Sequence, residues 1–178
     1  MSDNYAVGFP PVSRRDARVL VLGSLPGRRS LSEVQYYAQP RNAFWRIMGD
    51  LFDAGPDVEY SVRLERLIEQ RIALWDVVQA GVRPGSLDSE IDRSSIVIND
   101  FREFFENHPQ VEIVCFNGKT AADLFRRRVT PSLPESQARI AFSVLPSTSP
   151  AYAAVSYADK LMSWTAALSS RLDRNRVL

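Results

Sequence analysis

The stretch that decides the fold is residues 19–52, which read VLVLGSLPGRRSLSEVQYYAQPRNAFWRIMGDLF. Its first four residues are apolar, which is typical of a strand buried on both faces of a sheet. A loop with two glycines and a proline follows at residues 23–27, and an amphipathic helix begins near Phe44. In α/β sheets, ligands usually bind where such a strand opens into a loop. We therefore expect the functional site at this end of the strand.

Strand and helix patterns alternate along the rest of the chain. Further strands are predicted at 72–78, 111–116 and 140–145, and helices at 43–52, 62–70, 99–107 and 157–172, with one more that follows the turn at 117–118 and runs to about 128. This order predicts a three-layer α/β/α fold with a central four-stranded parallel sheet. Residues 1–16 are expected to form an extended N-terminal arm, and residues 79–98 a long connection. With no internal repeat or linker, the 178 residues are expected to form a single domain.

Composition excludes several classes of protein. The net charge of +1 predicts no strong overall field, so a nucleic-acid partner would need a local basic patch. Cys115 is the single cysteine and His108 the single histidine, so neither a disulfide nor a histidine-rich metal site is expected. We see no signal peptide and no apolar run of the ~20 residues that span a membrane. The expectation is a cytoplasmic protein without metal or cofactor.

Familiar catalytic motifs are absent from the loops at the predicted strand ends. The sequence has no G-x-S-x-G elbow, no G-x-G-x-x-G fingerprint and no Walker loop after the first strand. His108 precedes a strand in an Asn-His-Pro turn and is more typical of a loop than of a general base. Chemistry is therefore expected from amides, carboxylates, hydroxyls and the backbone. The Gly23–Gly27 loop could approach an anion, although a tight turn is the simpler interpretation of that pattern.

Three segments resemble the uracil-DNA glycosylase superfamily, and within it the hypoxanthine-DNA glycosylase branch. Residues 23–27 (GSLPG) with residues 35–45 (QYYAQPRNAFW) carry the specific resemblance. Residues 116–119 (FNGK) are similar to a strand-to-helix turn of the mismatch-specific members, and residues 145–149 (LPSTS) to the superfamily's serine-rich second motif. Two positions depart from the relatives. Leu25 stands where mismatch-specific members have a water-positioning Asn, and Leu145 stands where the best-known uracil enzymes have a His.

The resemblance implies a metal-free glycosylase that flips a damaged nucleotide out of double-stranded DNA and acts as a monomer. It assigns catalysis to Asn42, which would orient the attacking water, and stacking on the flipped base to Tyr37. The residues implied to bind the substrate are Gly23, Ser24, Leu25, Pro26, Gly27, Tyr37, Trp75, Asp76 and Asn117. Those implied to contact DNA are Arg28, Lys119, Ser147, Thr148, Ser149 and Pro150.

Each of these residues also has a purely structural interpretation. Asn42 precedes a helix, where asparagine is a favoured N-cap, and both roles can coexist. Tyr37 could equally be a core residue beneath its loop. Asp76 could accept the N1–H of hypoxanthine or cap a turn, because a carboxylate beside a developing base anion would oppose its departure. Lys119 could be a solvated lysine, and residues 147–149 could cap the last helix.

The leading prediction is a monofunctional DNA glycosylase that removes deaminated bases, hypoxanthine first, with uracil and xanthine as further candidates. Leu25 is the feature that favours an alternative, a non-catalytic DNA-binding protein on the same scaffold. The modest net charge slightly favours a third, an α/β enzyme acting on free nucleosides or nucleotides.

Overall fold

The computed structural model describes residues 4–172, with the side chains of residues 170–172 left out. Residues 1–3 of the predicted arm and residues 173–178 of the predicted domain lie outside this range. The strands are β1 (Tyr5–Val7), β2 (Val19–Gly23), β3 (Ile72–Asp76), β4 (Val78–Val82), β5 (Val97–Ile98), β6 (Ile113–Asn117) and β7 (Ala141–Leu145). The α-helices are α1 (Arg28–Glu33), α2 (Phe44–Phe52), α3 (Tyr60–Glu69), α4 (Phe101–Asn107), α5 (Lys119–Arg128) and α6 (Tyr157–Leu172). Short 3-10 turns lie at Asp88–Glu90 (η1), Thr130–Ser132 (η2) and Glu135–Gln137 (η3).

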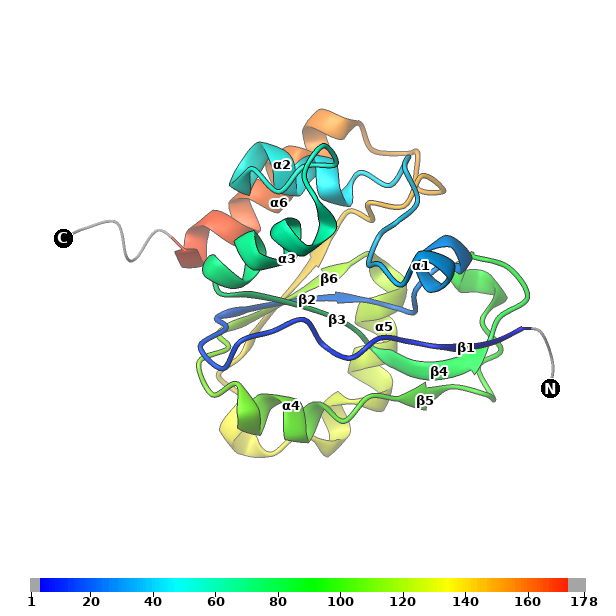
Figure 1. Ribbon diagram of the computed structural model, residues 1–178. Coiled ribbons are helices and arrows are strands. Elements are labelled where there is room, and N and C mark those ends of the chain that lie inside the picture. The colour runs from blue at the N-terminus through cyan, green and yellow to red at the C-terminus, as the bar shows by residue number, and fades with distance from the viewer. Residues whose placement is uncertain (1–3, 173–178) are drawn as a thin grey trace.

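The centre of the molecule is a parallel sheet in the order β3-β2-β6-β7. Every residue of β2 is buried, as its unbroken apolar run predicts. Alternate residues of β2 face two separate cores. Val19 and Val21 pack with α2 and α6, whereas Leu20 and Leu22 pack with α4 and α5. Figure 1 shows the resulting layers, with α2, α3 and α6 on one side of the sheet and α4 and α5 on the other. The predicted three-layer α/β/α fold is confirmed.

A second, antiparallel sheet in the order β1-β4-β5 extends from the parallel sheet, to the right in Figure 1. The chain passes from one sheet to the other at Val77, whose N–H donates to the Gly23 carbonyl. The sequence analysis expected an extended arm at residues 1–16 and a long connection at 79–98, and it did not predict the strands that these segments contain. β1 has three residues and β5 has two, so neither is long enough to show the alternation of apolar and polar residues that marks a strand. Helix α1 was also missed, because its six mostly polar residues carry no apolar stripe.

Candidate functional site

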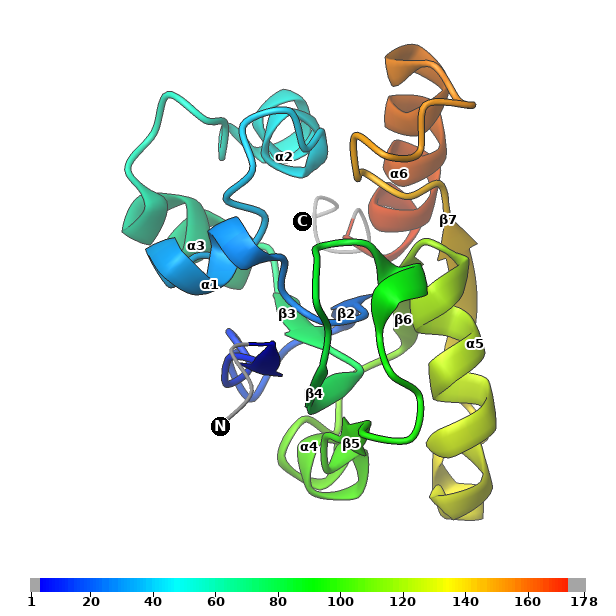
Figure 2. The ribbon, with the colours of Figure 1, turned by 90° about the vertical axis from the view of Figure 1, so that its right-hand side faces the viewer.

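The four parallel strands end at one edge of the sheet, and Figure 2 looks onto it. Gly23 at the end of β2 is paired with Asp76 at the end of β3, and Asn117 at the end of β6 with Leu145 at the end of β7. The loops that the sequence analysis singled out therefore lie next to one another. Residues more than 100 positions apart in sequence share this edge, which is the usual position of a ligand site in an open α/β sheet.

Asn117 links β6 to the serine-rich loop after β7. Its Oδ1 accepts a hydrogen bond from the Thr148 N–H, and its Nδ2 donates one to Thr148 Oγ1. Each of these bonds is 2.8 Å long. Gly118 has a φ of 96°, and a Cβ there would lie only 3.1 Å from the Cβ of Ser147. Glycine is therefore required where the two loops meet. The Asn-Gly pair holds residues 147–148 in a fixed position against the end of β6.

The same loop holds the start of α2. The Thr148 carbonyl accepts a hydrogen bond of 2.9 Å from the Ala43 N–H. The preceding residue, Asn42, is half-buried and accepts a 3.0 Å hydrogen bond from the Phe44 N–H on its Oδ1. Ala43 is the N-cap residue of α2, so Asn42 stands one position before it and pairs the first N–H of the helix, which fixes the orientation of the amide. An amide oxygen has two lone pairs, so Oδ1 can still accept a hydrogen bond from a water molecule.

Tyr37 lies beside this loop in an uncommon backbone conformation. Its φ is 55°, in the left-handed region that costs a non-glycine residue free energy. One face of its ring stacks on Phe44, with 4.0 Å between ring centroids and 26° between planes. The neighbouring Tyr36 is buried in the core and donates its hydroxyl to the Pro10 carbonyl. The strained backbone thus directs two successive tyrosines to different places.

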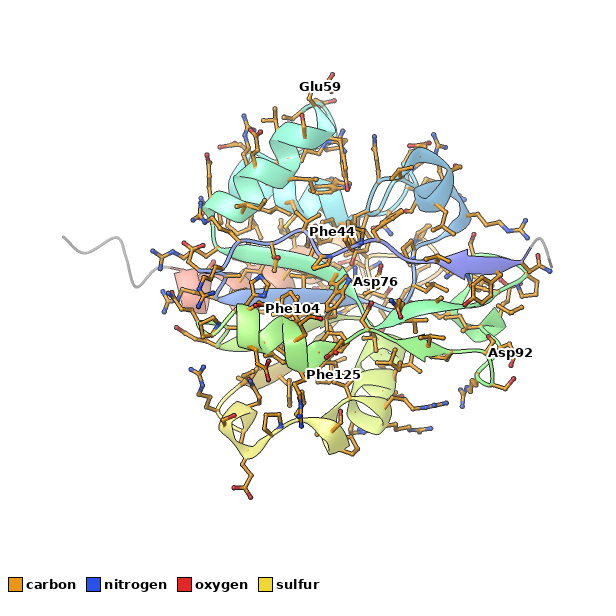
Figure 3. All side chains as sticks on the ribbon, turned by 60° about the horizontal axis from the view of Figure 1, so that its bottom comes forward. Phe44, Glu59, Asp76, Asp92, Phe104 and Phe125 are labelled. Carbon is orange, nitrogen blue, oxygen red and sulfur yellow. The ribbon has the colours of Figure 1, made fainter. Side chains whose placement is uncertain are left out.

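Asp76 is a buried carboxylate at the end of β3. Its side chain packs against the backbone of Gly23. A Cβ at that glycine would lie only 2.4 Å from Asp76 Oδ1 and 3.3 Å from Tyr37 Oη. Burial and, to a smaller extent, the nearby Asp88 carboxylate raise the pKa of Asp76 to about 7, against the opposing effect of Arg83. Figure 3 shows Asp76 near the junction of β3 and β4. The carboxyl group of Asp76 therefore changes protonation state near neutral pH.

The loop after β2 is braced by residues that the sequence analysis missed. Arg83 is buried. Its guanidinium donates one hydrogen bond of 3.1 Å to the Leu25 carbonyl and another to the Pro26 carbonyl. The Ser24 hydroxyl donates to the Asp88 carboxylate. The only signal at Arg83 was the Arg-Pro-Gly-Ser turn pattern, and arginine is rarely buried unless it is paired. The Leu25 side chain faces a small apolar cluster formed with Ala6, Val78 and Ile91.

Trp75 lies on the other face of the sheet from Asp76, because successive residues of a strand point to opposite sides. Its indole packs on Phe101 and Phe104 of α4, and its Nε1 donates to the Phe9 carbonyl. A cavity of about 270 Å³ beside α4, lined partly by Trp75 and His108, also lies on this face. The position of Trp75 does not favour the contact with a substrate base that the resemblance implied, so we leave it out of the candidate site.

Most residues predicted to contact DNA lie around the rim, but Thr148 is buried and its side chain is hydrogen-bonded to Asn117, so the structure does not favour a DNA contact for it. Lys119 is exposed at the start of α5, and Arg28 is exposed at the start of α1 with its side chain bound to the Pro84 carbonyl. In the serine-rich loop, Ser147 and Ser149 accept hydrogen bonds from backbone N–H groups within the loop. The following residues, 150–154, are exposed. The loop therefore has a shape fixed from within and an exposed tip.

Residues 4–172 contain no cluster of three or more His, Cys, Asp or Glu side chains that could hold a metal ion. Within the same range, none of the helices combines the length and the apolar character needed to cross a membrane.

Comparisons with known proteins agree on one family. The family model of the uracil DNA glycosylase superfamily matches residues 10–169. Two relatives named hypoxanthine DNA glycosylase, from Methanosarcina acetivorans and Methanosarcina barkeri, are 42% and 41% identical over 117 and 119 residues. Each match covers 65% of this chain and 73% of the relative. A solution NMR structure of a Methanosarcina acetivorans protein, described as a candidate uracil DNA glycosylase, superposes with a TM-score of 0.77 at 35% identity. That match covers 93% of this chain and 98% of the other.

Proposed function

The chain belongs to the uracil DNA glycosylase superfamily and is a DNA N-glycosylase, and we propose that it removes hypoxanthine from double-stranded DNA in base-excision repair. Uracil and xanthine are further candidate substrates. The names of the two Methanosarcina relatives support hypoxanthine as the first substrate. One structural observation carries the proposal. Thr148 forms hydrogen bonds with both Asn117 and Ala43 and so joins three loops at the strand ends.

Hydrolysis of the N-glycosidic bond requires an extruded nucleotide, a positioned water and a stabilised leaving base. The water oxygen bonds to C1′ of the deoxyribose, and the electron pair of the C1′–N bond leaves with the base. The proton of the water ends on the released base. Positive charge builds on the sugar before the water bonds, so positioning the water matters more than deprotonating it.

We assign the positioning of the water to Asn42. Its Oδ1 is fixed by the Phe44 N–H and keeps a lone pair for one O–H of the water. The cap and the catalytic contact therefore use the same oxygen, and the helix supplies the rigidity that a neutral amide needs in this role. Ordering the water in advance lowers the entropic part of the barrier.

The flipped base is proposed to lie between Tyr37 and the end of β3. Phe44 covers one face of the Tyr37 ring, so a base would stack on the other face. Stacking of this kind contributes about 1–3 kcal/mol per base. Asp76 and Asn117 would contact the polar edge of the base, and the backbone of residues 23–27 would border it.

The exposed rim would bind the DNA backbone. Arg28 and Lys119 would contact phosphates, and Ser147, Ser149 and Pro150 would enter the groove beside the extruded nucleotide, while the buried Thr148 holds their loop from within. Every contact in this scheme comes from one chain, so a monomer suffices for the reaction.

The experiment is a base-release screen with purified protein and duplex oligonucleotides that contain one deoxyinosine, deoxyuridine or deoxyxanthosine. Alkali cleaves the abasic product, so strand breaks report base release. We expect the fastest release from deoxyinosine and no release from an undamaged duplex. Salt-sensitive DNA binding with no release from any lesion would replace this proposal with the non-catalytic alternative. Release from free inosine but not from DNA would indicate an enzyme of free nucleosides.

A further inference from the structure

Two buried side-chain atoms within residues 4–169 have no hydrogen-bond partner, Tyr37 Oη and Asp76 Oδ2. Buried polar atoms are almost always paired, so each exception calls for an explanation. The two side chains come from different segments but meet beside Gly23. Both side chains lie at the strand ends, in the candidate site. This position indicates that a bound ligand supplies the missing hydrogen-bond partners.

The surroundings of Asp76 do not favour a charged carboxylate. Arg83 is the nearby cation, but its guanidinium already donates to backbone carbonyls. The other ionisable groups that face Asp76 are the phenols of Tyr36 and Tyr37 and the carboxylate of Asp88. A buried charge without a paired counter-ion is costly, and a second carboxylate adds repulsion. Binding a proton removes both penalties.

We propose, building on the glycosylase function above, that Asp76 meets the flipped base as a neutral carboxylic acid. Its O–H donates a hydrogen bond to the carbonyl oxygen of the base, and its other oxygen accepts one from the adjacent ring N–H. The same residue thus favours bases that carry a carbonyl beside a ring N–H over adenine and cytosine, although guanine and thymine carry this pair too, and stabilises such bases as they leave.

The chemistry of deaminated bases fits this arrangement. Hypoxanthine, uracil and xanthine each present a ring N–H next to a carbonyl, and a carboxylic acid offers one acceptor and one donor side by side. When the glycosidic bond breaks, its electron pair enters the base and negative charge reaches the carbonyl oxygen. The hydrogen bond from Asp76 then strengthens, and the proton stays on Asp76. An ionised Asp76 would instead repel the departing anion.

The test is the pH dependence of single-turnover hypoxanthine release from a deoxyinosine duplex. The protonated form of Asp76 is lost as pH rises through its raised pKa of about 7. The wild-type rate should therefore fall by about tenfold per pH unit above that value. Asp76→Asn keeps a donor and an acceptor at every pH, so it should remain active and lack this fall. His108→Gln is the matched control, because His108 bonds Ser13 and Phe104 behind the sheet, and it should keep the fall.

A second substrate tests the same contact in the wild-type protein alone. A duplex that carries 1-deazapurine has C–H groups in place of both the ring N–H and the base carbonyl, so this base cannot accept the Asp76 hydrogen bond. Its release should fall less steeply above neutral pH than that of hypoxanthine. A fall on this substrate as steep as that on hypoxanthine, or a hypoxanthine rate that is flat or rises through neutral pH, would overturn the inference but leave the glycosylase function standing. Absence of hypoxanthine release by the wild type at every pH would instead remove the proposed function.

Discussion

The two sides of the candidate site differ in how their polar groups are paired. On one side, Asn117, Thr148 and Asn42 form hydrogen bonds with the protein itself. On the other side, Tyr37 and Asp76 each leave a buried oxygen without a partner. The first side needs no ligand to be complete, whereas the second does. We infer that the paired side holds the reacting water and the DNA loop and that the unpaired side receives the base, with Asn117 beside Tyr37 at the boundary between them.

The largest effect is expected where the unpaired side is most tightly packed. In Gly23→Ala the new Cβ would fall 2.4 Å from Asp76 Oδ1 and displace that carboxyl group. A displacement of about 1 Å in a catalytic site can cost ~100-fold, so we expect at least about 100-fold slower hypoxanthine release. Gly27→Ala is the matched control in the same loop, because its Cβ would meet Ser86 at 4.0 Å. Equal rates for the two variants would argue against a role for Asp76 in base release.

A slightly smaller effect concerns the stability of the unpaired side. The folded state raises the pKa of Asp76 from 3.8 to about 7, so the folded protein binds a proton that the unfolded chain has released. This contribution to stability is present at low pH and is lost as pH rises between these two values. Wild type should lose roughly 2–3 kcal/mol of unfolding free energy between about pH 5 and 8 through this group.

Asp76→Asn should lack that loss. The unfolding free energy of the variant should therefore rise relative to that of wild type from pH 5 towards pH 8. Urea unfolding at several pH values measures the difference. If the variant and the wild type show the same pH dependence, Asp76 does not carry the proton.

Tyr37 should give a smaller effect, of about tenfold. Tyr37→Ala removes the ring on which the base is proposed to stack and should weaken binding to a deoxyinosine duplex by about tenfold, at the lower end of known stacking energies. Tyr37→Phe keeps the ring and its stack on Phe44 and should retain most of that affinity. Fluorescence anisotropy with a labelled duplex compares the variants, and an undamaged duplex serves as reference. Wild-type affinity for the lesion in Tyr37→Ala would place the base elsewhere.

The smallest effect tests the paired side. Asn42→Ala removes the side-chain cap on the Phe44 N–H and should lower the unfolding free energy by about 1 kcal/mol. Asn42→Ser should leave stability almost unchanged, because serine caps helices about as well. Thermal unfolding of the two variants gives the comparison. An alanine variant as stable as wild type would mean that the cap contributes nothing measurable.

The parallel sheet was predictable from sequence because its strands are apolar runs separated by amphipathic helices. The position of Asn42 before a helix was predictable for a similar reason, since capping is a local property. The antiparallel sheet was not, because β1 and β5 are too short to carry a pattern and their partners are remote in sequence. The roles of Arg83 and Asp88 were also hidden. An arginine buried against backbone carbonyls is a product of tertiary packing, and no spacing in the sequence announces it.

The orientation of neighbouring side chains was another limit. Trp75 and Asp76 are adjacent in sequence, and both were expected to contact a substrate. The alternation of β3 sends Trp75 to the α4 side and leaves Asp76 at the site. The resemblance to a family points to this strand end, but only the register of the sheet separates the two residues.

The most direct test of the account is single-turnover hypoxanthine release by Asn42→Ser. Serine keeps the helix cap but withdraws the amide oxygen from the water, so the variant separates the two roles of Asn42. We expect a rate about 10²–10⁴-fold below that of wild type, with unchanged thermal unfolding and unchanged affinity for the deoxyinosine duplex. A rate equal to that of wild type would contradict the account, because the water would then be positioned by some other group.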